Sequence, residues 1–190
     1  KFCRNLQFDD CVWGGMVDAK MATALTGRNG QALEDYKKRL LKLNNQVVAQ
    51  APEDLVINTH VCRGNYHSTF FSSGAYDSVA DLLFGEENVN AYYLEYDDKR
   101  SGGFAPLAKV SGDKKVVLGL ITTKIPQLED KGKVIARIHE AEKYVPLDRL
   151  YLSPQCGFAS CEIGNKLTEE EQWEKLKLVK EIAEEVWGDR

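Results

Sequence analysis

The chain has 190 residues, of which 43% are hydrophobic and 28% charged, and its formal net charge is −4. This length suffices for one domain with a substantial core. The mildly acidic balance argues against a nucleic-acid-binding surface, and no apolar run approaches the roughly 18 residues of a membrane span. No basic-then-apolar leader opens the chain, and five cysteines without a tight spacing pattern are typical of reduced thiols. We therefore expect a cytoplasmic protein.

Apolar runs of strand length alternate with helical patterns along the chain. The longest helical pattern near the N-terminus has apolar residues at spacings of three and four. Gly85 is the expected stop of a shorter helix, and Thr168 with Glu171 forms a capping box for the last one. The predicted strands cover residues 3–10, 54–62, 90–97, 114–124 and 149–157, and the predicted helices cover residues 31–50, 76–85, 127–145 and 167–188.

The order of these elements predicts an α/β fold. Strands that are apolar throughout and alternate with helices are typical of a parallel sheet covered by helices. About five strand–helix units fit the C-terminal part of a (β/α)8 TIM barrel, or else an open doubly wound sheet. No G-x-G-x-x-G follows any predicted strand, which weakens a dinucleotide-binding interpretation.

The chain begins without Met and runs at once into a strand. We therefore expect residues 1–190 to be a single domain that forms the C-terminal portion of the barrel of a longer chain. Five strands would leave sheet edges and apolar faces exposed, which proteins normally avoid. A missing N-terminal segment or a homo-oligomer is expected to cover them.

Every predicted strand ends in polar or reactive side chains. In a β/α barrel the carboxyl ends of all strands open on one face, where the chemistry takes place. We therefore expect these side chains to share one rim. They are Asp9 and Asp10, His60 and Cys62, Glu95 and Asp97, Thr122, Thr123 and Lys124, and finally Gln155 and Cys156.

A zinc site is one interpretation of this rim. His60 and Cys62 are two residues apart on a strand, so their side chains project to one side. With Glu95 and Cys156 they offer two sulfurs, one nitrogen and one oxygen, a set that suits tetrahedral Zn²⁺. The alternatives are a structural histidine, cysteines that act as small hydrophobes, and a Glu95 that pairs with Arg100.

The remaining candidates are weaker. Cys161 is a possible rival to Cys156, whereas Cys3 and Cys11 flank the first strand and are interpreted as packing residues. We expect no ligand role for His67 or for His139, which falls inside a predicted helix. Asp9 and Asp10 have a structural alternative as ion-pair partners of Arg4 or Arg63.

Four motifs in order carry a resemblance to a known family. LQFDD, HVC, YYLEYD and SPQCG follow one another as in the catalytic barrel of cobalamin-independent methionine synthase, and the chain looks most similar to its shorter, single-barrel members. The resemblance covers essentially the whole chain. It implies zinc ligands at His60, Cys62, Glu95 and Cys156.

The resemblance also implies substrate contacts. Asp9 stands where the family binds the substrate amino group, and Asp10 occupies the adjacent acidic position. The sequence departs from the family at TTKIP, where Lys124 stands in place of a histidine proposed to transfer a proton, and at Gln155, which is often Asp. Asp9 and Lys124 are therefore the catalytic candidates. From its position alone, and not from the resemblance, Arg63 or Asn65 is expected to approach a substrate carboxylate.

The predicted ligand set favours one kind of chemistry. Two thiolates and a carboxylate give Zn²⁺ a net charge of −1, which is poor for activating water but suits a bound, nucleophilic thiolate. We therefore expect methyl transfer from 5-methyltetrahydrofolate (polyglutamate) to homocysteine. The alternatives are zinc-dependent alkyl transfer involving another thiol or a corrinoid methyl donor, and a non-catalytic barrel fragment.

Overall fold

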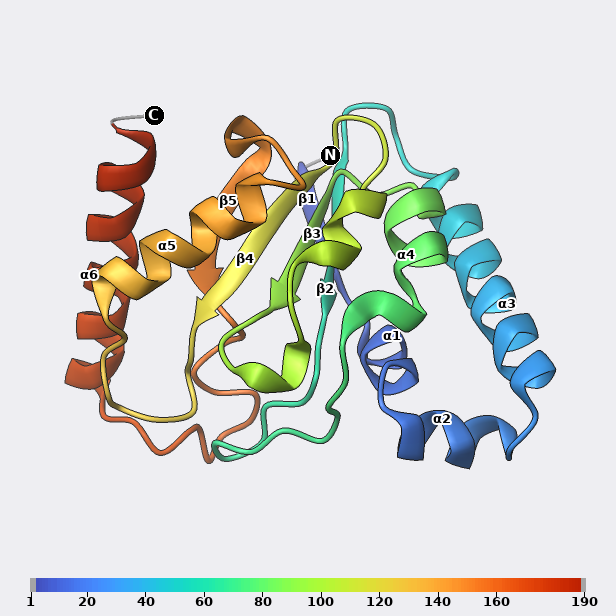
Figure 1. Cartoon of the computed structure of the whole chain (residues 1–190), viewed down its shortest axis with the longest axis horizontal. Coiled ribbons are helices and arrows are strands. Elements are labelled where there is room, and N and C mark those ends of the chain that lie inside the picture. Colours follow the sequence, from blue (N-terminus) through green and yellow to red (C-terminus); the bar gives the residue numbers. More distant parts are fainter. Residues whose placement is uncertain (1–2, 189–190) are drawn as a thin grey trace.

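The computed structural model describes residues 3 to 188, in which five parallel strands form one sheet (Figure 1). The strands lie in the order β1-β2-β3-β4-β5, so each strand pairs with its neighbour in the chain. A doubly wound sheet reverses its strand order at a switch point, whereas barrel strands follow chain order. The sequential order therefore favours the barrel prediction. The strands are β1 (Asn5–Asp9), β2 (Val56–Val61), β3 (Ala91–Glu95), β4 (Lys115–Ile121) and β5 (Leu150–Pro154).

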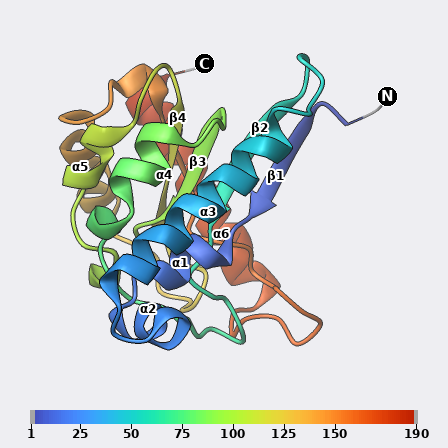
Figure 2. The same cartoon turned by 90° about the vertical axis from the view of Figure 1, so that its right-hand side faces the viewer.

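Helices cover the sheet, with α5 and α6 beside β4 and β5, and α3 and α4 toward β2 and β1 (Figure 1). Figure 2 shows α3 in front of the sheet, with α1 and α2 below it. The α-helices are α1 (Cys11–Met16), α2 (Ala19–Thr26), α3 (Gly30–Val48), α4 (Ala80–Glu86), α5 (Lys131–Glu142) and α6 (Glu169–Trp187). Short 3-10 turns lie at Tyr76–Ser78, Lys99–Ser101, Ala105–Lys109 and Leu147–Arg149. Within residues 3–188, no helix is both long enough and apolar enough to cross a membrane.

The long predicted helices and the Thr168 capping box are confirmed, but two details differ. Gly85 is not the stop of its helix, because α4 continues for one more residue to Glu86. The carbonyl of Gly85 accepts a hydrogen bond from the hydroxyl of Ser111 at 2.7 Å. Helices α1 and α2 were not expected. Each begins at an aspartate, Asp10 or Asp18, whose carboxylate accepts hydrogen bonds from the first turn.

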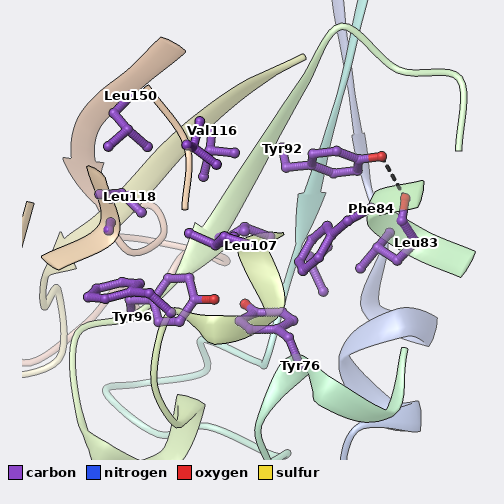
Figure 3. Close-up of a cluster of buried hydrophobic side chains, with 14 of the residues drawn as sticks. Tyr76, Leu83, Phe84, Tyr92, Tyr96, Leu107, Val116, Leu118 and Leu150 are labelled. Carbon is purple, nitrogen blue, oxygen red and sulfur yellow. Dashed lines mark hydrogen bonds between the residues drawn. The ribbon is translucent and has the colours of Figure 1, made fainter. Parts of the chain in front are cut away.

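The main core lies between the sheet and the helices and is rich in aromatic rings (Figure 3). The ring centroids of Tyr76 and Tyr96 are 5.2 Å apart, as are those of Phe84 and Tyr92. The Tyr92 hydroxyl donates to the carbonyl of Leu83 at 2.6 Å. Since side chains alternate along a strand, β3 directs Tyr92 into this core and turns Glu95 to the opposite face. The core thereby fixes the face on which the polar side chains gather.

Gly119 lets β4 pass closely between its neighbours. A Cβ atom at this position would lie 2.7 Å from the Leu94 carbonyl oxygen and 2.7 Å from the Cα of Gln155. Just beyond it the pairing of β4 with β5 shifts in register, and the Gln155 amide donates to the Ile121 carbonyl at 2.8 Å. The absent side chain therefore makes room for the segment that carries Cys156.

Candidate metal centre

The four predicted ligands converge at the carboxyl ends of the strands. His60 lies one residue before the end of β2, Cys62 directly follows β2, Glu95 ends β3, and Cys156 follows β5. One ligand atom from each of the four lies within 4.8 Å of all the others. Cys156 is half-buried and the other three side chains are buried. In Figure 1 the arrowheads of β3 and β4 point toward the lower edge, where the segments that follow the strands lie.

His60 has the surroundings of a metal-binding imidazole. Its Nδ1 lies 3.3 Å from the carbonyl oxygen of Tyr93, while its buried Nε2 has no hydrogen-bond partner among the described residues. That nitrogen is 3.8 Å from Oε1 of Glu95. A metal-binding histidine normally uses one nitrogen for a backbone or carboxylate contact and keeps the other for the ion. An unpartnered buried nitrogen directed at two thiols and a carboxylate therefore fits a zinc ion.

Glu95 is held rigidly from two sides. The backbone amide of Arg63 donates to its Oε1 at 2.7 Å, and the guanidinium of Arg100 donates to its Oε2 at 2.7 Å. Arg100 also contacts Asp97 at 2.8 Å. Burial raises the pKa of Glu95, and the Arg63 amide opposes this shift. The predicted alternative, a Glu95–Arg100 ion pair, is therefore present as well. It does not exclude the four-residue group, because Arg100 contacts Oε2 whereas Oε1 lies on the side of His60.

The two sulfur atoms of the group lie within 4.8 Å of each other. The neighbouring Cys156 lowers the pKa of Cys62, and His60 and the Gly64 amide add to this effect. The same contact raises the pKa of Cys156. Burial alone would lower the pKa of His60, but its contact with Cys62 outweighs burial and raises it. The site thus stabilises a thiolate, the form that binds metal.

Asp9 borders the group on its open side. It is exposed, its Cα pairs with that of His60, and it lines a pocket of about 420 Å³ together with His60, Tyr93 and Cys156. Burial raises its pKa, followed by the influence of Cys62. The carboxylate is therefore available to a molecule that enters the pocket beside the two predicted ligands.

Asp10 and Arg63 lie outside that pocket. One oxygen of Asp10 accepts from the first amides of α1, and the other accepts from Asn44 at 3.0 Å. The guanidinium of Arg63 is fully buried, with its carbon 4.2 Å from the ring centroid of Tyr76, and it donates to the Gly74 carbonyl. Both side chains thus hold the strand-end loops, and their predicted substrate contacts stay predictions.

Asn65 and Lys124 form a buried network of their own. The amide nitrogen of Asn65 donates to Gly157 at 2.7 Å, and its oxygen accepts from Lys124 at 3.2 Å and from Asn165 at 2.9 Å. Asn165 also donates to the Thr123 carbonyl at 2.8 Å. This network joins the segments that follow β2, β4 and β5. The predicted roles of Asn65 in binding and of Lys124 in catalysis remain predictions.

The weaker candidates separate clearly. Cys161 is exposed and does not belong to the four-residue group, and neither do His67 and His139. Cys3 and Cys11 are exposed, so their interpretation as packing residues was wrong. Cys11 is the first residue of α1, and its side chain stays accessible to solvent while Trp13 and Met16 of the same helix are buried.

Comparison with known families identifies the chain. Residues 22–185 match the family model described as the catalytic domain of cobalamin-independent synthase. The chain belongs to this family. Two Bacillus subtilis relatives, the uncharacterized proteins YxjG and YxjH, are each 47% identical over 97% of this chain, which covers 49% of their length. The chain thus spans about half the length of these curated relatives.

Solved structures agree with this assignment. A Listeria monocytogenes protein assigned as a vitamin-B12-independent methionine synthase is 39% identical, with a TM-score of 0.74 over 99% of this chain and 50% of its own. A B12-independent methionine synthase from Shewanella, solved with selenomethionine, is 20% identical, has a TM-score of 0.67 over 96% of this chain and 48% of its own, and shows the shared fold. The predicted resemblance and the predicted barrel class are confirmed.

Proposed function

We propose that this chain carries the zinc site of a methyltransferase that transfers the methyl group of 5-methyltetrahydrofolate (polyglutamate) to homocysteine, forming methionine. The observation that carries the proposal is the convergence of His60, Cys62, Glu95 and Cys156, with the buried Nε2 of His60 unpartnered among the residues described. Membership of the cobalamin-independent synthase family supports methyl transfer in general. The specific substrates, the zinc ion and the activity of the whole protein are part of the proposal.

The donor set supports thiol alkylation over hydrolysis. Two thiolates and a carboxylate outweigh the charge of Zn²⁺ and leave the centre negative, whereas hydrolytic zinc sites favour neutral histidines and an open position. A zinc ion held by these four side chains would keep an incoming thiol ionised and nucleophilic at neutral pH. Thiolate ligands also require reduced cysteines, so we place the protein in a reducing compartment such as the cytoplasm.

Asp9 is the residue that we assign to substrate orientation. Its carboxylate lies in the same pocket as His60 and Cys156, so an amino acid whose ammonium group pairs with Asp9 has its side chain next to the ligand group. The hydrogen bonds from Arg63 and Arg100 fix the position of the Glu95 carboxylate in this site. The Shewanella protein was solved with selenomethionine, an analogue of the product proposed here.

The methyl transfer itself needs few protein groups. The ionised sulfur attacks the methyl carbon, the bond from that carbon to the donor nitrogen breaks, and the nitrogen gains a proton. Lys124 is the candidate proton source by its sequence position, but its ammonium group is buried and donates to Asn65. The main alternative to Lys124 is therefore a different proton source. The main alternative to the methyl-folate is a different methyl donor.

Metal analysis tests the proposal directly. We expect about one zinc per chain in the unmodified protein and a loss of most of it in Cys62→Ser and in Cys156→Ser. Cys161→Ser is the matched control, since this thiol is exposed and lies outside the ligand group. Unchanged zinc content in both ligand variants would end the proposal.

Turnover assays separate the substrates. Methionine formation from homocysteine and a methyl-folate supports the reaction proposed, whereas turnover only with another thiol or a methyl-corrinoid favours the alternative transferase. Zinc binding without turnover on any of these pairs favours a non-catalytic barrel portion. Native mass measurement on the same sample reports whether a second copy covers the sheet edges.

A further inference from the structure

Cys62 belongs to two clusters rather than one. Besides the four-residue group, the Sγ atoms of Cys62 and Cys11 and a carboxylate oxygen of Asp9 all lie within 4.8 Å of one another. Cys62 is the member that the two clusters share. The function proposed above uses Cys62 as a ligand and gives Cys11 no role.

The backbone fixes the proximity of the two thiols. Asp9 pairs with His60, and the amide of Asp10 donates to the His60 carbonyl at 2.8 Å, so β1 and β2 stay together up to the start of α1. A Cβ atom at Gly14 would lie 2.0 Å from the Cys62 carbonyl oxygen, so this glycine lets α1 pack directly on the Cys62 backbone. Cys11 therefore faces Cys62 because two packed elements place it there.

The two thiols differ in access to solvent. Cys11 is exposed and borders an apolar surface pocket of about 590 Å³ that also includes Val12, Met21 and Phe71. Only 6% of the surface of Cys62 is accessible to solvent. A dissolved oxidant can thus reach Cys11 first, and Cys62 lies behind it as a resolving thiol.

From this arrangement we propose that Cys11 and Cys62 form a reversible disulfide that removes Cys62 from the ligand group. A disulfide requires its sulfurs to approach about 2.05 Å. The two sulfurs lie within 4.8 Å of each other, so both side chains must move closer to form the bond. The modification site is the Cys11–Cys62 pair, and the oxidant class is a small disulfide such as oxidised glutathione.

The exchange balances in two steps. Cys11 first loses its proton, against the raised pKa that burial and the neighbouring Cys62 give it. Its sulfur then attacks one sulfur of oxidised glutathione, which forms a mixed disulfide and releases one glutathione thiol. The Cys62 sulfur then attacks the Cys11 sulfur and releases the second glutathione thiol. The protein loses two protons and two electrons, and the oxidant gains them. A reducing thiol reverses both steps.

Loss of metal binding is the expected consequence, and this part rests on the proposed zinc function. With its sulfur bonded to Cys11, Cys62 offers no thiolate to the group of His60, Glu95 and Cys156. Oxidation would thus prevent zinc uptake by the group. Cys156 also lies near Cys62 and is the competing partner for a disulfide.

Peptide mapping tests the linkage itself. The full chain is treated with a chelator and then with oxidised glutathione, digested without reductant and analysed by mass spectrometry. We expect a Cys11–Cys62 linked peptide in the unmodified chain and in the matched control Cys161→Ser, and none in Cys11→Ser or Cys11→Ala. A Cys62–Cys156 link in the unmodified chain, or no internal link, would overturn the proposal. Circular dichroism confirms that the variants fold.

Zinc uptake tests the consequence. We expect the oxidised unmodified chain to lose most of its uptake and to regain it with a reducing thiol, whereas Cys11→Ser keeps its uptake through the same treatment. Equal loss in Cys11→Ser would overturn the switch. If the reduced chain takes up no zinc, the proposed function fails, while the linked peptide still decides the disulfide.

Discussion

Glu95 and Glu87 are both fully excluded from solvent, yet their surroundings differ in kind. Glu95 receives a backbone amide and the guanidinium of Arg100, and it lies 3.8 Å from His60. Glu87 receives only neutral donors, from the amide of Asn44 at 2.7 Å and the indole of Trp13 at 3.4 Å. Its second oxygen has no hydrogen-bond partner within the part of the chain described.

The contrast shows how a protein assigns different tasks to the same side chain. A cation balances the charge of Glu95 and keeps it useful as a ligand, even though burial raises its pKa. Burial dominates at Glu87 and raises its pKa to about 7, while the hydrogen bond from Asn44 opposes the shift. Glu95 is therefore suited to bind a cation in the ligand group, whereas the surroundings of Glu87 favour a protonated, neutral carboxyl group.

The largest expected effect is on zinc affinity, which should differ between substitutions of Glu95 and of Glu87. We expect Glu95→Gln to weaken zinc binding by at least about 100-fold, because it replaces a ligand with a neutral amide. Glu87→Gln is the matched substitution and should leave the affinity unchanged. Competition with a chromophoric zinc chelator measures both. An equal loss in the two variants would remove the distinction drawn here.

The second effect is a pH dependence of stability that originates at Glu87. Its pKa rises from 4.5 to about 7 on folding, so the folded state holds the proton more tightly than the unfolded state. The stabilisation that Glu87 contributes is then fully present below pH 4.5 and is lost as the pH rises through about 7. The loss from this group is about 3 kcal/mol at most. Urea unfolding between pH 5 and 8 measures the trend, with pH values chosen to span the window given by this shift.

Glu87→Gln isolates this contribution from that of other titrating groups. The difference in unfolding free energy between the two proteins should move in favour of Glu87→Gln as the pH increases through this window. A difference that stays constant with pH would show that Glu87 is ionised in the folded state at all these pH values.

The smallest expected effect concerns Asn44, which donates to Glu87 and also to Asp10 at 3.0 Å. Asn44→Ala removes the contact that lowers the pKa of Glu87, so the pKa should rise further and the stability window should shift to higher pH. The loss of hydrogen bonding should cost about 1 kcal/mol. Carbon-detected NMR titration of the Glu87 carboxyl measures the shift, and Gln46→Ala, an exposed position on the same helix, is the control.

The main features of the fold were predictable because they depend on local patterns. Apolar runs predicted all five strands, and the capping box at Thr168 predicted the start of α6. Helices α1 and α2 escaped prediction because they are short. Their stability comes from the carboxylates of Asp10 and Asp18 and from packing, including the contact of Gly14 with the Cys62 backbone.

The sequence by itself determined the fold class and the four side chains that converge, because parallel strands bring their carboxyl ends to one edge. Only the tertiary structure decided that Asn65 is bonded within a loop network and that Cys11 lies against Cys62. The physical reason is that hydrogen bonds between distant loops and the packing of a short helix depend on positions in space. The spacing of residues along the chain does not encode them.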